Sequence, residues 1–377
     1  MTVLGTRPDA VKLAPVVHAL RAEGLPVLVT VTAQHRELLD QVLSFFEIEP
    51  THDLDLMQPG QALPAFAGRA LHELGALLER TRPDMVVVQG DTTTAMAGAL
   101  AGHYANVLVA HVEAGLRSYD LRHPFPEEAN RRIISALADL HFAPTEVGRR
   151  NLLREGVGPE RVHVTGNTVI DALLYATERI SPERLRPELH RARLARRRLV
   201  LVTLHRRESF GRPLEGICDA LDALVRRHDD VELFFPVHPN PAVRKTVHER
   251  LGGRERVALV EPLAYLDFVA AMREAYFIVT DSGGVQEEAP SLGKPVLVLR
   301  DATERPEVVE IGAARLVGRR PEDVLAAAEE LLTSPLAYQA MTGHKNPYGD
   351  GDAARRIAKR VREVLASPSA APGAKDR

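Results

Sequence analysis

The hydrophobic and polar positions of the chain follow two alternating patterns. Short runs that are apolar at almost every position, such as 84–90 and 106–112, precede longer stretches in which apolar residues recur at helical spacing. Apolar runs without an alternating polar face are typical of strands that are buried on both sides of a parallel sheet. The pattern therefore predicts a series of β–α units with helices covering both faces of the sheet.

This series occurs twice along the chain. The first predicted strands lie at 2–4, 26–32, 84–90, 106–112, 140–144 and 162–166, and the second at 198–205, 231–238, 256–262, 276–281 and 294–300. Residues 178–198 between them are polar and basic, which favours a solvated helix and linker over a ligand-binding patch. We expect an α/β protein with two doubly wound domains, joined near residues 167–198. Ligands of such sheets bind at the carboxyl ends of the strands, and two such edges can face each other across a cleft.

Composition and charge narrow the functional classes. Hydrophobic residues make up 45% of the chain and charged residues 26%, which is the balance of a globular protein. The formal net charge of −3 gives no electrostatic case for nucleic acid or an anionic membrane as partner. With one cysteine, Cys218, an intrachain disulfide is impossible. The N-terminal residues lack a signal-peptide core and no run of about 18 apolar residues occurs, so we expect a cytoplasmic protein.

Two predicted strands end in a carboxylate with a glycine nearby. Asp91 follows the strand at 84–90, and Glu113 follows the strand at 106–112. If these strands are neighbours, which places them about 4.8 Å apart, both carboxylates converge on one small ligand. The alternative is that each acid caps the helix that follows it. Glu127 and Arg131 belong to another predicted helix start, where acids are also ordinary helix chemistry.

The segment around Ser282, Gly283 and Gly284 joins a predicted strand, which ends at Thr280, to a helix predicted to begin near Val285. Free N–H groups at a helix start suit a phosphate, and glycines let the backbone approach it closely. Glu288, one turn into the helix, is within reach of a ribose. The alternative is a tight turn without a ligand, because Gly-Gly turns are common.

Other polar residues also follow predicted strands. Arg7 and Lys12 suit a second anionic contact or a charged first helical turn, and His205 and His238 are candidates for catalytic or structural roles. None of the 15 His has metal-ligand spacing, so we predict no metal. No G-x-G-x-x-G loop is present, which argues against a dinucleotide cofactor.

Taken together, these stretches resemble the non-hydrolysing UDP-N-acetylglucosamine 2-epimerase family. Eleven matching segments occur in order between Leu4 and Ile357, among them GTRPDAVKLAPVV (5–17), GDTTT (90–94), HVEAGLRS (111–118), PFPEEANRR (124–132), TGNTVIDALL (165–174), HRRESFG (205–211) and TDSGGVQEEAPSLGKPVLVLRDATERPE (280–307). The departures are small. Asp9 stands where Glu is usual, and Gln89 stands where His is frequent.

The resemblance implies two facing Rossmann-like domains of the glycosyltransferase-B type, at 1–167 and 168–356, with the active site in the cleft between them. It also implies a C-terminal helix, which crosses back to the first domain, and a tail at 357–377. It implies reversible C2 epimerisation of UDP-GlcNAc to UDP-ManNAc in cell-envelope polysaccharide synthesis, by a homodimer without cofactor. The implied route eliminates UDP to a 2-acetamidoglucal and then adds it back. Rival hypotheses are a glycosyltransferase of the same fold, a hydrolysing epimerase and a non-catalytic UDP-sugar sensor.

The resemblance also implies residue roles. Asp91, Glu113 and Glu127 are expected to transfer protons, with His205 near the phosphate and the departing oxygen. The expected substrate contacts are Arg7, Lys12, Arg131, His238, Leu263, Phe268, Ser282, Gly283, Gly284, Glu288 and Arg305. Phe268 is the expected uracil stacker, with Leu263 contributing backbone and Glu288 binding the ribose. Relatives imply a second, activating UDP-GlcNAc site, matched here by Gln34, Gln61, Arg206 and Glu208.

Overall fold

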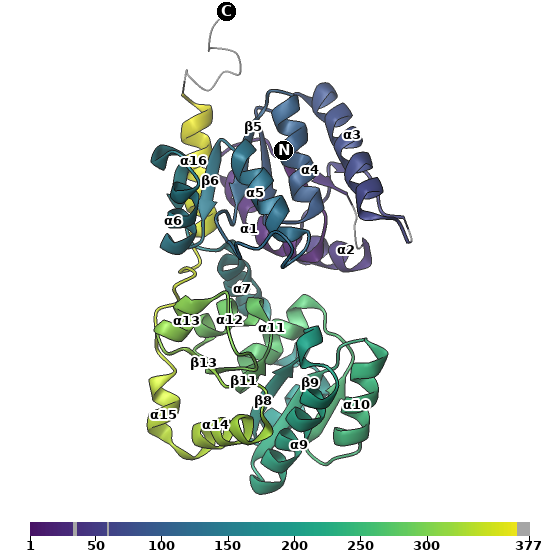
Figure 1. Ribbon diagram of the computed structural model, residues 1–377, viewed down its shortest axis with the longest axis vertical. Helices are drawn as coiled ribbons and strands as arrows, with labels where there is room; N and C mark the ends of the chain where they lie inside the picture. Colours follow the sequence, from purple (N-terminus) through teal and green to yellow (C-terminus); the bar gives the residue numbers. More distant parts are fainter. Residues whose placement is uncertain (33–35, 59, 368–377) are drawn as a thin grey trace, which may run out of the picture. The chain divides into compact units, whose positions relative to one another are not determined.

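The computed structural model describes residues 1–32, 36–58 and 60–367, which fall into two compact units. The first unit comprises Met1–Ala172 together with the chain from Tyr348 onward, and the second comprises Leu173–Pro347. Each unit contains its own parallel sheet with helices between successive strands (Figure 1). The predicted two-domain α/β fold is confirmed.

The first unit is built on a seven-stranded sheet in the order β3-β2-β1-β4-β5-β6-β7. Its strands are β1 (Thr2–Leu4), β2 (Val29–Val31), β3 (His52–Asp53), β4 (Met85–Gln89), β5 (Leu108–Val112), β6 (Leu140–Ala143) and β7 (Val162–Val164). Its helices are α1 (Arg7–Ala22), α2 (Arg36–Phe45), α3 (Leu63–Thr81), α4 (Thr93–Tyr104), α5 (Glu127–Leu137), α6 (Glu146–Arg154) and α16 (Ala353–Leu365), and α7 (Thr168–Arg179) begins in this unit.

The strand order of the first unit reverses between β1 and β4, and ligands of such sheets bind beside this switch point. All five residues of β4 are buried, as expected for a strand that is covered on both faces. Close packing at the end of β1 requires a glycine, because a Cβ at Gly5 would clash with the side chain of Thr94. The ends of β1, β4 and β5 therefore form one closely packed edge.

The second unit has a six-stranded sheet in the order β10-β9-β8-β11-β12-β13. Its strands are β8 (Arg198–Thr203), β9 (Val231–Pro236), β10 (Val257–Val260), β11 (Ala275–Thr280), β12 (Val296–Val298) and β13 (Ala314–Leu316). Its helices are α8 (Pro187–Leu194), α9 (Arg212–Arg227), α10 (Pro241–Leu251), α11 (Tyr265–Glu274), α12 (Gly283–Glu288), α13 (Pro306–Glu310), α14 (Pro321–Thr333) and α15 (Pro335–Ala340). The switch point lies between β8 and β11, whose ends carry His205 and the segment after Thr280.

The basic stretch at 178–198 includes α8. Two of its arginines, Arg191 and Arg197, each lie 3.0 Å from the carboxylate of Glu232, which is fully buried. A buried carboxylate requires such partners, so these two arginines have a structural role.

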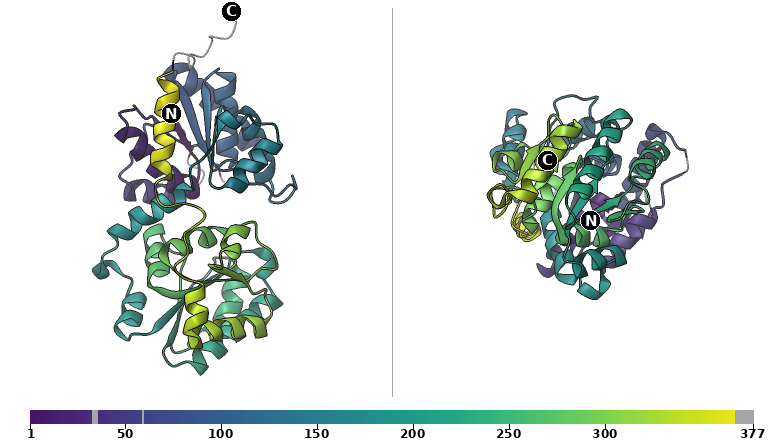
Figure 2. Two further views of the ribbon diagram at one scale, coloured as in Figure 1. Left: turned by 90° about the vertical axis from the view of Figure 1, so that its left-hand side faces the viewer. Right: turned by 90° about the horizontal axis from the view of Figure 1, so that it is seen from below.

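The chain from Tyr348 onward adds to the first unit, where α16 packs against α1 (Figure 2). The first turn of α16 is capped by a residue far away in the sequence. The carboxylate of Asp171 accepts hydrogen bonds from the backbone N–H groups of Ala353 at 3.3 Å and Ala354 at 2.8 Å. These bonds satisfy helix N–H groups that have no partner within the helix. Within the described residues, no helix is both long and apolar enough to cross a membrane.

Candidate active site

Two carboxylates, Asp91 and Glu113, lie at the ends of neighbouring strands of the first unit. β4 pairs in parallel with β5, with Gln89 opposite Val112, so the condition for converging carboxylates is met. Gly90 has a φ of 69°, and a Cβ there would lie 3.5 Å from Oε2 of Glu113. The backbone that leads to Asp91 therefore passes directly beside the carboxylate of Glu113.

Glu113 is buried and is held by donors from three separate parts of the first unit. The Nζ atom of Lys12 on α1 lies 2.6 Å from Oε1 and 2.7 Å from Oε2. Gln89 at the end of β4 donates to Oε2, and Nδ2 of Asn167 donates to Oε1 at 3.1 Å. Lys12, which the sequence predicted as an anion contact, thus pairs with a catalytic candidate in this structure. Gln89 and Asn167 were missed as part of the site.

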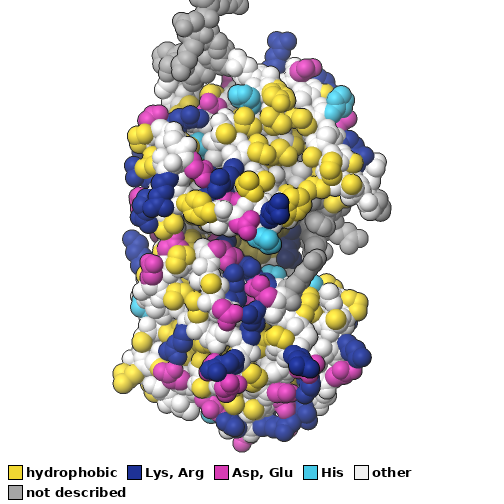
Figure 3. Space-filling view, viewed as in Figure 1, with side chains coloured by type: hydrophobic (Ala, Val, Ile, Leu, Met, Phe, Trp, Pro, Cys, Tyr) yellow, Lys and Arg dark blue, Asp and Glu magenta, His cyan; other side chains and the backbone are white. Residues whose placement is uncertain are grey.

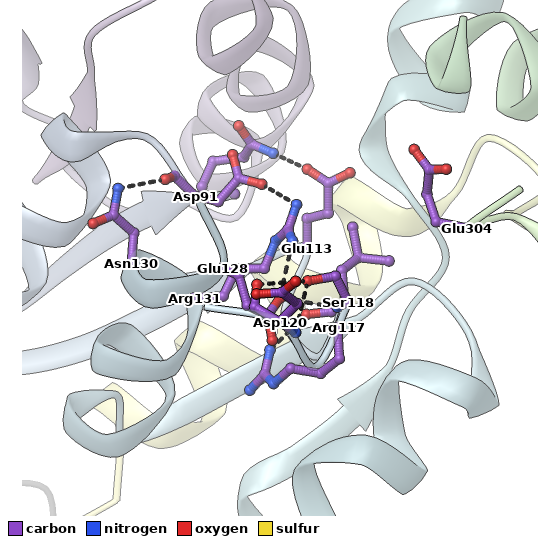
Figure 4. A network of polar contacts seen from close by, with 12 residues as sticks. Asp91, Glu113, Arg117, Ser118, Asp120, Glu128, Asn130, Arg131 and Glu304 are labelled. Atoms are coloured by element: carbon purple, nitrogen blue, oxygen red, sulfur yellow. Dashed lines mark hydrogen bonds and ion pairs between the residues drawn. The ribbon is translucent and has the colours of Figure 1, made fainter. Parts of the chain in front are cut away.

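Asp91 is held by the start of α5. Its Oδ2 atom lies 2.5 Å from the guanidinium of Arg131, and its backbone carbonyl accepts from Nδ2 of Asn130 at 2.8 Å. Figure 4 shows Arg131 between Asp91 and Glu128, whose carboxylate lies 3.1 Å from the same guanidinium. Arg131, predicted as a substrate contact, therefore also orients a catalytic candidate.

Glu127 and Glu128 begin α5 side by side but have different surroundings. Glu128 is fully buried and accepts backbone N–H groups of Ser118 and Tyr119 at 3.0 and 3.3 Å. Oε2 of Glu127, in contrast, is buried without a hydrogen-bond partner. A buried polar atom without a partner costs free energy unless a ligand or water satisfies it, so Glu127 is the better candidate for chemistry.

Asp9 is a further acid at this edge of the sheet. Its Oδ2 atom accepts from the N–H groups of Gly5 and Thr6 at 3.0 and 3.1 Å, and from the hydroxyl of Thr92 at 3.3 Å. Burial raises the pKa of Asp9 to about 6, against the lowering effect of its hydrogen bonds with Gly5 and Thr6. Asp9 thus fixes the turn after β1, where Arg7 begins α1.

In the second unit, His205 after β8 pairs with Asp281 after β11. Nδ1 of His205 lies 3.0 Å from Oδ1 of Asp281, which is fully buried and also accepts the hydroxyl of Ser209 at 2.9 Å. Burial raises the pKa of Asp281, but the hydrogen bond and charge of His205, with further donors, outweigh it and hold the pKa below its usual value. Sequence reasoning missed Asp281, although it lies directly before Ser282.

The glycine turn of the second unit lies beside Arg305. α12 begins at Gly283, two residues earlier than predicted, with Ser282 as its N-cap. A Cβ at Gly283 would lie 3.1 Å from the guanidinium carbon of Arg305, so this cation rests on the turn. The guanidinium is held by Glu287 at 2.7 Å. Glu288 is buried near Gly284, whose added Cβ would lie 3.6 Å from its Oε1 atom.

One carboxylate, that of Glu304, joins two predicted groups of residues. It lies 2.8 Å from Arg206, 2.6 Å from Arg300 and 3.1 Å from Arg305. Burial opposes its charge, but the three guanidinium groups lower the pKa of Glu304 to about 2. Arg206 was predicted for the second ligand site and Arg305 for the substrate site, so both cations share an anion that the sequence did not single out.

The remaining predicted residues are more dispersed. Nδ1 of His238 accepts the N–H of Asn240 at 3.2 Å, Leu263 is buried before α11, and Phe268 is half-buried on α11. Of the residues expected at the second UDP-GlcNAc site, Gln61 forms hydrogen bonds with Met57 and Arg69. The carboxylate of Glu208 lies 3.8 Å from Arg300, and Gln34 lies outside the described residues. In the described part of the chain, no group of three or more His, Cys, Asp or Glu residues could hold a metal ion.

Comparisons with known proteins place the chain in a family. Residues 18–362 match the family model described as UDP-N-acetylglucosamine 2-epimerase. A protein of that name from Yersinia pestis is 52% identical over 96% of this chain and 98% of its own length, and one from Escherichia coli K12 is 51% identical over 95% and 96%.

Solved structures agree with this assignment. The UDP-GlcNAc 2-epimerase of Neisseria meningitidis, bound to UDP-GlcNAc, aligns with a TM-score of 0.88 at 44% identity, covering 96% of this chain and 99% of that chain. The S. aureus MnaA–UDP co-structure aligns with a TM-score of 0.87 at 46% identity, covering 97% and 96%. The chain belongs to the non-hydrolysing UDP-N-acetylglucosamine 2-epimerase family, as its motifs predicted.

Proposed function

We propose that the protein interconverts UDP-GlcNAc and UDP-ManNAc by inverting C2 of the sugar. The observation that carries this proposal is the pair of carboxylates, Asp91 and Glu113, at the ends of adjacent strands β4 and β5. Epimerisation at C2 requires removal of a proton from one face and return of a proton to the other. Glu127, with its unpartnered buried oxygen, supplies a third acid near the start of α5.

The proposed route avoids a free carbanion. A carboxylate removes the C2 proton while the C1–O bond breaks, and the electron pair of that bond leaves on the β-phosphate oxygen of UDP. The products are bound UDP and a 2-acetamidoglucal with a C1=C2 double bond. UDP then adds back to C1 while a carboxylic acid delivers a proton to the opposite face of C2, which restores all atoms with one centre inverted.

The second unit is proposed to bind the UDP group. Arg305 and the turn at Ser282, Gly283 and Gly284 offer a cation and closely approachable backbone to the diphosphate. His205 is proposed to donate a proton or hydrogen bond to the departing phosphate oxygen. Its Nδ1 atom is engaged by Asp281, which leaves Nε2 for the ligand.

Proton NMR of UDP-GlcNAc incubated with the pure protein tests the function. We expect a second anomeric signal from UDP-ManNAc to appear without any acceptor, and no free UDP to accumulate. A requirement for an acceptor would point to a glycosyltransferase, and one free UDP per turnover would point to a hydrolysing epimerase. Absence of any turnover despite UDP binding would leave only a nucleotide-sugar sensor.

The same assay tests the proposed second UDP-GlcNAc site at Gln34, Gln61, Arg206 and Glu208. Arg206 shares the carboxylate of Glu304 with Arg305, which gives a physical route by which one site affects the other. We expect sigmoidal dependence of the rate on UDP-GlcNAc and little conversion of pure UDP-ManNAc until UDP-GlcNAc is added. Hyperbolic kinetics in both directions would contradict the second site.

Gly284 gives a test of the nucleotide-binding turn. Because an added Cβ makes only ordinary contacts there, Gly284→Ala and Gly284→Val should fold, while the larger side chain obstructs the phosphate. We expect Gly284→Val to weaken UDP binding by about tenfold or more, which corresponds to about 1.4 kcal/mol. Calorimetry measures this, with Gly68→Ala on the exposed face of α3 as the control. Unchanged UDP affinity in folded Gly284→Val would remove this turn from the site.

We also propose that the protein is a homodimer. Tyr104 on α4 and Ile133 on α5 are 72% and 42% exposed, and these two helices pack against each other. Hydrophobic side chains also gather on the face of the first unit that Figure 3 shows. A second copy of the chain is the occupant that the family likeness favours. Light scattering should give twice the chain mass, and Tyr104→Asp combined with Ile133→Arg should give a monomer.

The cytoplasmic location expected from the sequence stays a prediction, which cell fractionation checks.

A further inference from the structure

Three of the hydrogen bonds of Asn167 join it to different parts of the first unit. Its side-chain Nδ2 donates to Oε1 of Glu113 at 3.1 Å, and its Oδ1 accepts the backbone N–H of Val169 at 3.1 Å. Its own backbone N–H donates to the carbonyl of Tyr348 at 2.6 Å. Asn167 is 2% exposed, so these bonds are formed away from solvent.

The orientation of the Asn167 amide follows from this pattern. An amide offers donors only at nitrogen and an acceptor only at oxygen. Because the N–H of Val169 needs an acceptor, Oδ1 must face it, and Nδ2 is then directed at Glu113. The contact adds no charge to the site, in which Lys12 already provides a cation for Glu113.

Asn167 also lies where the chain leaves the first unit and returns to it. The unit ends at Ala172, five residues later, and begins again at Tyr348. The two segments touch through backbone, because a Cβ at Gly166 would lie 3.2 Å from the Cα atom of Gly349. One residue therefore bonds to the outgoing segment at Val169, to the returning segment at Tyr348 and to the carboxylate of Glu113.

We propose that Asn167 is a positioning residue, which fixes the Glu113 carboxylate relative to the two segments through which the chain crosses between its units. This inference rests on the proposed epimerase function and deepens it. Lys12 and Gln89 hold Glu113 from α1 and β4, and Asn167 supplies the bond that ties it to the crossing. Loss of this side-chain bond alone therefore leaves Glu113 without one of its donors, even where the backbone contacts of the two segments remain.

Asn167→Asp tests the proposal most directly. The Asp side chain keeps an acceptor for the N–H of Val169, but it presents an oxygen in place of the donor to Glu113. We expect kcat to fall about ten- to hundredfold, the scale for a misplaced catalytic group, with UDP affinity unchanged. Asn167→Ser, whose shorter side chain withdraws the donor from Glu113 without adding charge, should also lower kcat.

The pH profile of kcat separates positioning from a structural role. The charged and titratable groups around Glu113 are Lys12 on α1, which pairs with it, and His111 on β5, which interacts electrostatically with both Glu113 and Asp91. A new carboxylate at position 167 disfavours the charged form of Glu113, so the limb of the profile that belongs to Glu113 should move to higher pH in Asn167→Asp. Asn167→Ser should show the kcat loss without this shift.

The control is Asp171→Asn, which alters the same crossing without contacting Glu113. Asp171 caps α16 through Ala353 and Ala354, so this variant should melt earlier but keep the kcat and pH profile of the wild type. If Asn167→Asp and Asn167→Ser behave like Asp171→Asn, Asn167 is only structural and the inference is wrong. If the wild-type protein itself does not epimerise UDP-GlcNAc, the proposed function fails instead, so the two failures are distinguishable.

Discussion

Glu113→Gln is expected to lower kcat by at least about a hundredfold, the usual scale for losing an acid–base group. The Gln side chain keeps the shape of Glu113 but can accept hydrogen bonds at only one of its two terminal atoms, and it cannot take or give a proton at the pH of the assay. Asp91→Asn and Glu127→Gln should have losses of the same size. Calorimetry should show UDP affinity within about twofold of wild type, because the proposed UDP contacts belong to the second unit.

The control for these variants is Glu146→Gln on α6, whose side chain is 64% exposed. An exposed acid at a distance from the site should leave kcat unchanged and stability within about 0.5 kcal/mol. Thermal melting of all variants separates loss of chemistry from loss of fold, which matters for Glu113 because three side chains bond to it. Near-wild-type rates in all three acid variants would show that the acid assignment is wrong.

The two sheets could be predicted from the sequence because most of their strands are short apolar runs between helical stretches. β4 and β5 are buried almost throughout, so nearly every position had to be apolar. β3 and β13 were missed. They comprise His52–Asp53 and Ala314–Leu316, and each contains a charged residue, Asp53 or Arg315, so neither is an apolar run.

From the sequence, a residue could be assigned to the site only where it directly follows a predicted strand. The sequence places Asp91, Glu113 and His205 at strand ends, but not the side chains that hold them. Lys12 and Asn167 are 101 and 54 residues from Glu113 along the chain, so their bonds depend on strand order and register. Asp281 was missed for a different reason. An Asp that follows a strand is also typical of a helix start, so its position alone does not indicate a site.

Epimerisation in D₂O is expected to give UDP-ManNAc that carries deuterium at C2. In the proposed route, one group removes the proton from one face of C2 and a different group returns a proton to the opposite face. A carboxylic acid exchanges with solvent far faster than a typical turnover of about 10 per second, so the returning group is deuterated. Mass spectrometry of the product should show one added mass unit, and proton NMR should show loss of the C2 signal.

The elimination route also requires the C1–O bond to break, which isotopic oxygen can report. An ¹⁸O label in the bridging position of UDP-GlcNAc should move into non-bridging oxygens of the β-phosphate, provided that this phosphate rotates while UDP is bound. The rival route is hydride transfer from C2 to a bound nicotinamide cofactor, which gives an N-acylimine at C2; return of the same hydride to the opposite face inverts C2 without breaking C1–O. The sequence has no G-x-G-x-x-G loop for such a cofactor. Full retention of protium at C2, together with NAD recovered from the purified protein, would therefore contradict the elimination hypothesis. Deuterium at C2 with scrambled ¹⁸O is the outcome that only elimination and re-addition of UDP produces.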